Sequence, residues 1–192
     1  MKVLSLLNLK STLSSCTNPN CAPNSLAEKI EQRGIQLAAL TDLNTAMNCP
    51  AFFVNCSKHN IACLFGMEAW TGDDLRTLVL FSDLKLAVDF CSSWYDTLPV
   101  STSRKRQYYV DEDGEIIGEL KKDLQNRSPV KHAVLEKQAI NYGGILAYVK
   151  PGEELILDTG NEVLLNEDST VNLKAIEKAF ARLQVPQAEP LT

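Results

Sequence analysis

The chain has 192 residues, of which 45% are hydrophobic and 22% are charged, and its formal net charge is −5. A chain of this length suits a single domain with a sizeable core. The acidic balance argues against nucleic-acid binding, which depends on cationic contacts to phosphate. No apolar run reaches the roughly 18 residues that cross a bilayer. Asn8 and Lys10 interrupt the apolar start, so we expect no signal peptide, no membrane contact and a cytoplasmic location.

The first half alternates strand-like and helix-like segments. In chain order we expect strands over 3–9, 35–40, 61–65 and 75–81, and helices over 25–33, 48–59 and 83–95. Ser25 and Glu28 have the spacing of a capping box, and Asp83 is placed to cap the third helix. Such alternation with short connections predicts parallel strands joined by crossovers, and therefore an α/β fold.

The middle of the chain breaks this rhythm. The sequence Asp111-Glu112-Asp113-Gly114 lies between two β-prone runs, 108–110 and 115–117, which predicts a β-hairpin. We interpret the hairpin as an insertion over about 104–127 in a single domain spanning 1–185, with a helical segment over 119–127. The remaining expected elements are a helix over 129–142, strands over 145–149, 155–157 and 162–165, an amphipathic helix over 172–183, and a flexible tail over 186–192.

The chain has six cysteines, which are Cys16, Cys21, Cys49, Cys56, Cys63 and Cys91. Cys63 and Cys91 lie inside apolar runs, and we expect no export signal in the chain. We therefore expect buried, reduced thiols. The alternative is a thiolate metal site formed by Cys16 and Cys21 with Cys49 from a neighbouring loop, completed by Asp42 or Glu68. The gap between the first two is longer than zinc sites usually have.

Several short motifs occur where strands are expected to end. The segment Thr41-Asp42-Leu43-Asn44 resembles the Thr-Asp-His-Asn motif of the PHP family, named after polymerases and histidinol phosphatases. The segment 8–12 resembles that family's Asp-Leu-His-x-His, and Phe65-Gly66-Met67-Glu68 resembles its Pro-Gly-x-Glu. Further similar patches are the helix start at 48–51, the strand 75–81, and 143–151, which resembles Gly-Gly followed by Ala-His-Pro. The resemblance covers most of residues 1–151.

This resemblance implies a distorted β/α barrel, here short or incomplete, and metal-dependent phosphoesterase activity. In the family, His, Glu and Asp side chains at the strand ends hold two or three divalent metals. Carried over by position, the histidines are replaced in this chain by Lys10, Thr12, Leu43, Arg76 and Lys150. Of the acidic residues, Asp42 and Glu68 remain, and no histidine follows His132.

Lysine and arginine at ligand positions repel a divalent cation, so we expect a degenerate member of the family, without cofactor. Glu68 is then expected to pair with Lys10 or Arg76, and the chain to be a non-catalytic binding or regulatory module. One alternative is a phosphoesterase with a reduced Zn, Mn or Fe site. A second is a sensor that binds a small anion or phosphate ester through the cations of the pocket. An incomplete barrel leaves open edges, so a homodimer is also expected.

Overall fold

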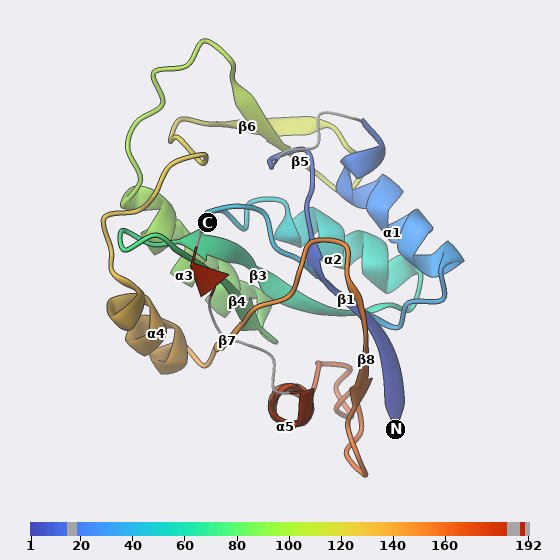
Figure 1. The fold of residues 1–192 in the computed structure, drawn as a ribbon. Coiled ribbons are helices and arrows are strands. Elements are labelled where there is room, and N and C mark those ends of the chain that lie inside the picture. The colour runs from blue at the N-terminus through green and yellow to red at the C-terminus, as the bar shows by residue number, and fades with distance from the viewer. Residues whose placement is uncertain (15–18, 184–188, 191–192) are drawn as a thin grey trace.

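The fold is a curled half-barrel sheet covered by helices, described by a computed structural model for residues 1–14, 19–183 and 189–190. Six strands of the main sheet follow the order β7-β4-β3-β2-β1-β8, and the seventh, β9, pairs with β4. Figure 1 shows this sheet at the centre of the molecule. Its strands are β1 (Lys2–Leu9), β2 (Leu37–Leu40), β3 (Ala62–Trp70), β4 (Leu75–Phe81), β7 (Ile145–Ala147), β8 (Glu154–Asp158) and β9 (Glu189–Pro190).

The strand directions are mixed, and the prediction of parallel strands holds only for β1, β2 and β3. The strands β4, β7 and β8 run antiparallel to their neighbours. The connection between β3 and β4 is the short turn 71–74, whereas a parallel crossover needs a dozen or more residues. Strand β3 also extends beyond the expected end at Phe65, and this extension brings Glu68 into the sheet.

Gly66 allows β3 and β4 to approach each other closely. A Cβ atom built at this position would lie 1.7 Å from the backbone oxygen of Val79. Any larger residue would force the two backbones apart. The absence of a side chain at Gly66 therefore sets the spacing of the strands that carry Glu68 and Arg76.

Helices cover both faces of the sheet. Four of them pack on one face, where their apolar side chains join Phe65, Met67 and Val79 in the larger core cluster. These are α1 (Pro23–Gln32), α2 (Cys49–Lys58), α3 (Leu84–Asp96) and α4 (His132–Asn141). The fifth helix, α5 (Leu173–Leu183), places Ile176 and Phe180 in a second cluster on the other face.

The two predicted helix caps have different outcomes. The capping box at Ser25 is wrong, because α1 begins at Pro23 and Ala22 is its N-cap, without a side-chain hydrogen bond. A proline suits the first helical turn because it lacks the amide that would need a partner there. The cap at Asp83 is confirmed, since its carboxylate accepts a hydrogen bond of 2.9 Å from the amide of Leu86.

The predicted hairpin is present as β5 (Gln107–Val110) and β6 (Ile116–Leu120). The helix expected over 119–127 is wrong, because 119–120 belong to β6, Lys122 forms a bridge, and the residues after it form a turn. Ser101 donates its amide to Lys121 at 2.9 Å, and Val100 and Lys122 form an antiparallel bridge. The hairpin lies beyond one end of the main sheet (Figure 1) and packs on a small apolar cluster of its own. That it is an insertion stays a prediction.

The last part of the chain is less regular than expected. The strand predicted over 162–165 is reduced to one bridge, between Leu165 and Val171. The flexible tail was expected over 186–192, and in this stretch Glu189–Pro190 pair with Leu75 and Arg76 of β4. The other tail residues lie outside the described part. None of the helices described is long and apolar enough to cross a membrane.

The cysteines in the described residues are of two kinds, free thiols and a disulfide-bonded residue. Cys49, Cys56, Cys63 and Cys91 are free and buried, as expected. Cys21 is instead disulfide-bonded, so the expectation of a reduced thiol is wrong there. Unlike the other four, Cys21 is only half-buried, in a loop segment with a single turn of 3₁₀-helix over Pro19–Cys21. Cys16 lies outside the described residues.

Candidate functional site

The candidate site lies where β1 and β2 end beside the middle of β3. Backbone hydrogen bonds fix the relative positions of its residues: the amide of Glu68 donates to the carbonyl of Asp42 at 3.0 Å, and the amide of Asn44 donates to the carbonyl of Glu68 at 2.8 Å. Leu43 forms the parallel bridge to Glu68. The segment that carries Asp42 is thus held next to the part of β3 that carries Glu68.

Glu68 is paired with two cations. The ammonium of Lys10 lies 3.7 Å from Glu68 Oε2, and the guanidinium of Arg76 lies 3.3 Å from Oε1. The Glu68 side chain is 9% exposed and that of Lys10 is 16% exposed, whereas Arg76 is 33% exposed. These contacts confirm the predicted ion pairing of Glu68, with both partners rather than one.

Each cation has one further contact. The ammonium of Lys10 also donates to the carbonyl of Thr41. Burial lowers the pKa of Lys10, and the nearby carboxylates of Glu68 and Asp42 oppose this shift. The guanidinium of Arg76 lies over the ring of Trp70, 4.7 Å from its centroid, in a cation–π arrangement. Lys10 and Arg76 are therefore each held in place by Glu68 and by one further group, the Thr41 carbonyl or the Trp70 ring.

Asp42 is a hydrogen-bond acceptor for the loop that follows β1. Its carboxylate accepts from the amide and hydroxyl of Ser11, at 2.7 and 2.6 Å, and from the hydroxyl of Ser14 at 2.7 Å. Burial raises the pKa of Asp42, while these donors and Lys10 favour its charged form. The side-chain amide of Asn48 also donates to the Ser11 hydroxyl at 2.9 Å. Both carboxylate oxygens are thus engaged by protein donors.

Asn44 has a similar role that the sequence did not reveal. Its side-chain amide donates to the carbonyls of Leu124 and Asn126 at 3.1 and 2.9 Å. Its side-chain oxygen accepts from the amide of Trp70 at 3.1 Å and from the indole of Trp94 at 2.9 Å. Its φ angle of 58° is left-handed, which asparagine tolerates better than most residues. The available signal was the place of Asn44 in the motif Thr41-Asp42-Leu43-Asn44, directly after an expected strand.

The other predicted site residues lie around this group. Leu43 is 4% exposed, and its amide donates to the Ser14 hydroxyl at 3.1 Å. Thr12 is half-buried in the turn after β1. Lys150 has an exposed side chain in the loop after β7, and its amide contacts Glu153. The structure therefore brings Lys10, Asp42, Glu68 and Arg76 together, with Lys150 outside their contacts.

Metal-ligating side chains are dispersed. Across residues 1–14, 19–183 and 189–190, no three His, Cys, Asp or Glu side chains converge to hold a metal ion. Cys21 is disulfide-bonded and so offers no thiolate. Burial raises the pKa of Cys49 to about 12, which keeps its thiol protonated near neutral pH. The two histidines make other contacts: His59 with Glu31 at 2.6 Å, and His132 with Thr77 at 3.4 Å.

Two cavities lie away from this group of residues. One, of about 440 Å³, lies among α4, β7 and α5. The other, of about 470 Å³, lies between the start of β3 and the turn 168–171. None of the seven predicted site residues lines either cavity.

Comparison with known proteins gives structural likenesses only. No protein-family model matches the chain, and no curated protein sequence is similar to it. Its fold is similar to the lesion-specific endonuclease PfuEndoQ from Pyrococcus furiosus, with a TM-score of 0.49, 13% identity, and 76% of this chain covered. The chain spans about a third of that endonuclease, 34% of its length.

A second similar structure is a protein of Bifidobacterium adolescentis provisionally described as a metal-dependent phosphoesterase. Its TM-score is 0.47 and its identity 12%, with 92% of this chain and 73% of that chain covered. Likenesses at this level do not transfer an activity. The function is therefore inferred from the residues of the site.

Proposed function

We propose that this chain is a PHP-like protein that acts as a non-catalytic binding or regulatory module, in which lysine and arginine occupy the place of divalent metals. The observation that supports it is the double ion pair of Glu68 with Lys10 at 3.7 Å and Arg76 at 3.3 Å. A metal site at this position would need the Glu68 oxygens as ligands, and both already face a cation.

The chemistry of the neighbouring residues supports the same proposal. The Asp42 carboxylate accepts three hydrogen bonds from Ser11 and Ser14. The aliphatic side chain of Leu43 cannot coordinate a metal. A divalent ion beside Glu68 would also lie close to two positive charges, and this repulsion is strong in a poorly hydrated site. The residues present therefore do not fit a metal cluster.

Metal binding and turnover distinguish this proposal from a phosphoesterase with a reduced metal site. We expect that Zn²⁺, Mn²⁺ and Fe²⁺ leave the melting temperature of the protein unchanged. We also expect no hydrolysis of generic phosphate esters above that of the Glu68→Ala variant. Stoichiometric metal in the purified protein, with turnover that disappears in Glu68→Ala, would establish the phosphoesterase instead.

Arg76 favours anion binding as a second candidate function. Its side chain is 33% exposed, while its Nε atom is buried and has no hydrogen-bond acceptor in the part of the chain described. The exposed part of the guanidinium suits a phosphate oxygen. Inorganic phosphate is then expected to raise the melting temperature of the wild type and of Arg127→Met, a control arginine, but not of Arg76→Met. An equal response of all three proteins would contradict an anion site at Arg76.

A further inference from the structure

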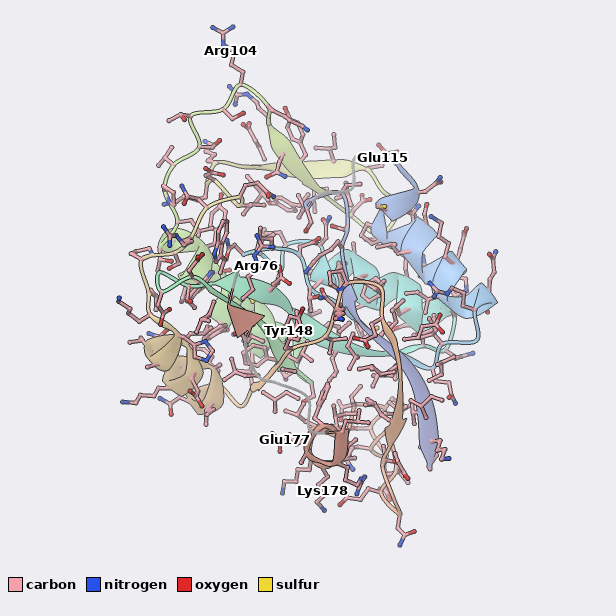
Figure 2. All side chains as sticks on the ribbon, in the orientation of Figure 1. Arg76, Arg104, Glu115, Tyr148, Glu177 and Lys178 are labelled. Carbon is pink, nitrogen blue, oxygen red and sulfur yellow. The ribbon has the colours of Figure 1, made fainter. Side chains whose placement is uncertain are left out.

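A cavity separate from the Glu68 group lies at the amino-terminal end of β3. It has a volume of about 470 Å³ and is bordered by α2, the first residues of β3, the start of α3 and the turn 168–171. Arg76 of the Glu68 group lies near the centre of the view in Figure 2 and does not line this cavity. Binding sites for small organic molecules usually measure about 300–1,000 Å³. The size of the cavity therefore suits one small organic molecule.

The apolar part of the lining includes an exposed aromatic ring. Ile61, Cys63 and Phe65 line the cavity and are buried. The Phe53 ring of α2 packs edge-on against Phe65, with the ring centroids 5.5 Å apart and an interplanar angle of 79°. Phe53 is nevertheless 42% exposed. Its exposed part offers a contact surface to a further aromatic ring.

The polar part of the lining has unused hydrogen-bonding groups. Asn60, Ser82 and Ser169 line the cavity, and within residues 1–14, 19–183 and 189–190 their side chains have no hydrogen-bond partner. Ser169 has a φ angle of 68°, a left-handed conformation that is uncommon for serine. Residues held in such sparsely populated conformations are concentrated at ligand-binding sites. The lining is therefore able to bind the polar groups of a ligand.

The charge of the lining is negative. Among the described residues, Asp83 and Asp168 are the charged ones, and lysine, arginine and histidine do not line the cavity. One oxygen of each carboxylate is engaged: Asp83 Oδ1 accepts from the amide of Leu86 at 2.9 Å, and Asp168 Oδ1 accepts from the hydroxyl of Thr170 at 2.6 Å. The other oxygen of each has no donor in the described part of the chain.

Both carboxylates are placed to favour a cation. The hydrogen bonds from Thr170 lower the pKa of Asp168, which keeps this group charged near neutral pH. The amino end of α3 would by itself attract an anion, but the Asp83 carboxylate already caps it. A negatively charged ligand would therefore meet two aspartates and no compensating cation in the described lining.

We propose that this cavity binds a small aromatic amine, in which a planar ring carries an ammonium group. The ring contacts Phe53 and the apolar lining, and the ammonium faces the carboxylates of Asp83 and Asp168. An ammonium has three donors and no acceptor, which suits carboxylate and hydroxyl oxygens. The cavity shares no residue with the Glu68 group, so metal or phosphate binding at Glu68 and Arg76 is tested separately.

Two probes with the same indole ring and opposite charges test the proposal on the full chain. Tryptamine carries an ammonium group, and indole-3-acetate carries a carboxylate. In an NMR titration of the nitrogen-15-labelled protein, tryptamine is expected to shift the amides of 57–65 and 168–171 saturably. Indole-3-acetate is expected to bind there about tenfold more weakly, because attraction to two carboxylates becomes repulsion.

Three substitutions each remove one contribution while keeping the local structure. Asp168→Asn removes a charge but keeps the acceptor for Thr170, and Asp83→Ser removes a charge but keeps a good helix cap. Phe53→Leu removes the ring but keeps an apolar side chain. Each is expected to weaken tryptamine binding about threefold. Glu167→Gln is the matched control and is expected to bind like the wild type, since exposed Glu167 lies next to Asp168 but does not line the cavity.

The location of the shifts and the order of the affinities decide the outcome. Tryptamine shifts that do not saturate, or that lie outside the cavity, overturn the proposal. Equal affinity of the two probes at the cavity overturns it as well, because the aspartates would then not select the charge of the ligand. It is also overturned if Asp168→Asn and Asp83→Ser both bind tryptamine as tightly as Glu167→Gln does.

Discussion

Replacing Glu68 by glutamine removes the shared partner of two cations while keeping the size of the side chain. The Lys10–Glu68 distance of 3.7 Å corresponds to an attraction of about 4–5 kcal/mol at an effective dielectric constant of about 20. Desolvation of both groups offsets much of this attraction. Without Glu68, the buried ammonium has lost its partner, so Glu68→Gln is expected to lower the free energy of unfolding by about 3–5 kcal/mol.

A double-mutant cycle isolates the interaction itself. Lys10→Met combined with Glu68→Gln replaces the buried pair by neutral groups, which is often close to neutral for stability. The coupling energy between positions 10 and 68 is therefore expected to be about 3 kcal/mol. The Arg76–Glu68 coupling should be smaller, about 1 kcal/mol or less, because solvent screens the 33% exposed Arg76.

Urea denaturation followed by far-ultraviolet circular dichroism measures these free energies. Tryptophan fluorescence is less suitable, because the Trp70 ring contacts Arg76 and would respond to the substitutions directly. A Lys10–Glu68 coupling below about 0.5 kcal/mol is the value of a solvated surface pair. That result would refute the reasoning, since Lys10 would then owe its position to Thr41 or to packing.

Three further perturbations test other parts of the structure. Gly66→Ala is expected to cost about 3 kcal/mol in chemical denaturation, because its Cβ meets the Val79 carbonyl at 1.7 Å; a stable variant would show that β3 and β4 can separate. Asn44→Ala strands four hydrogen-bonding groups, so we expect a loss of at least about 3 kcal/mol and faster hydrogen exchange at 124–126; unchanged exchange there would contradict the anchoring role. Burial lowers the pKa of Lys10, so with rising pH the folded chain loses the Lys10 proton before the unfolded chain does. The stability of the wild type relative to Lys10→Met should therefore rise as the pH climbs from the folded pKa towards 10.5. Parallel stability curves of the two proteins would contradict the shift.

The positions of the main elements could be predicted from apolar periodicity. The order of the motifs placed Lys10, Glu68 and Arg76 near one another, although it also included Lys150, which lies outside their contacts. Asp42 and Glu68 meet because each lies near the carboxyl end of a strand, and parallel neighbouring strands bring such ends together. Arg76 reaches Glu68 because the antiparallel register of β3 and β4 pairs Trp70 with Arg76, two residues from the Glu68–Leu78 pair. The register of these two neighbouring strands is enough to bring the Arg76 guanidinium to Glu68.

What the sequence could not provide were the strand directions and the distant hydrogen-bond partners. The turn 71–74 contains Gly72 and two aspartates, which is compatible with either a loop or a tight reversal. Asn44 contacts Asn126, which is 82 positions away, and no local pattern reports on such a partner. The 119–127 segment read as helical because it is polar, yet the buried Leu120 and Leu124 hold it against Leu98. Tertiary packing decided these features over local propensity.

Asp42 and Asn44, which follow the end of β2, anchor loops that are distant in sequence. Asp42 holds the loop containing Ser11 and Ser14, and Asn44 holds the segment at 124–126. A molecule that bound the Asp42 carboxylate would have to displace those serine donors and would leave their loop without its attachment. We therefore expect any ligand at this end of the sheet to bind on the side of Arg76, whose side chain is 33% exposed, rather than at Asp42.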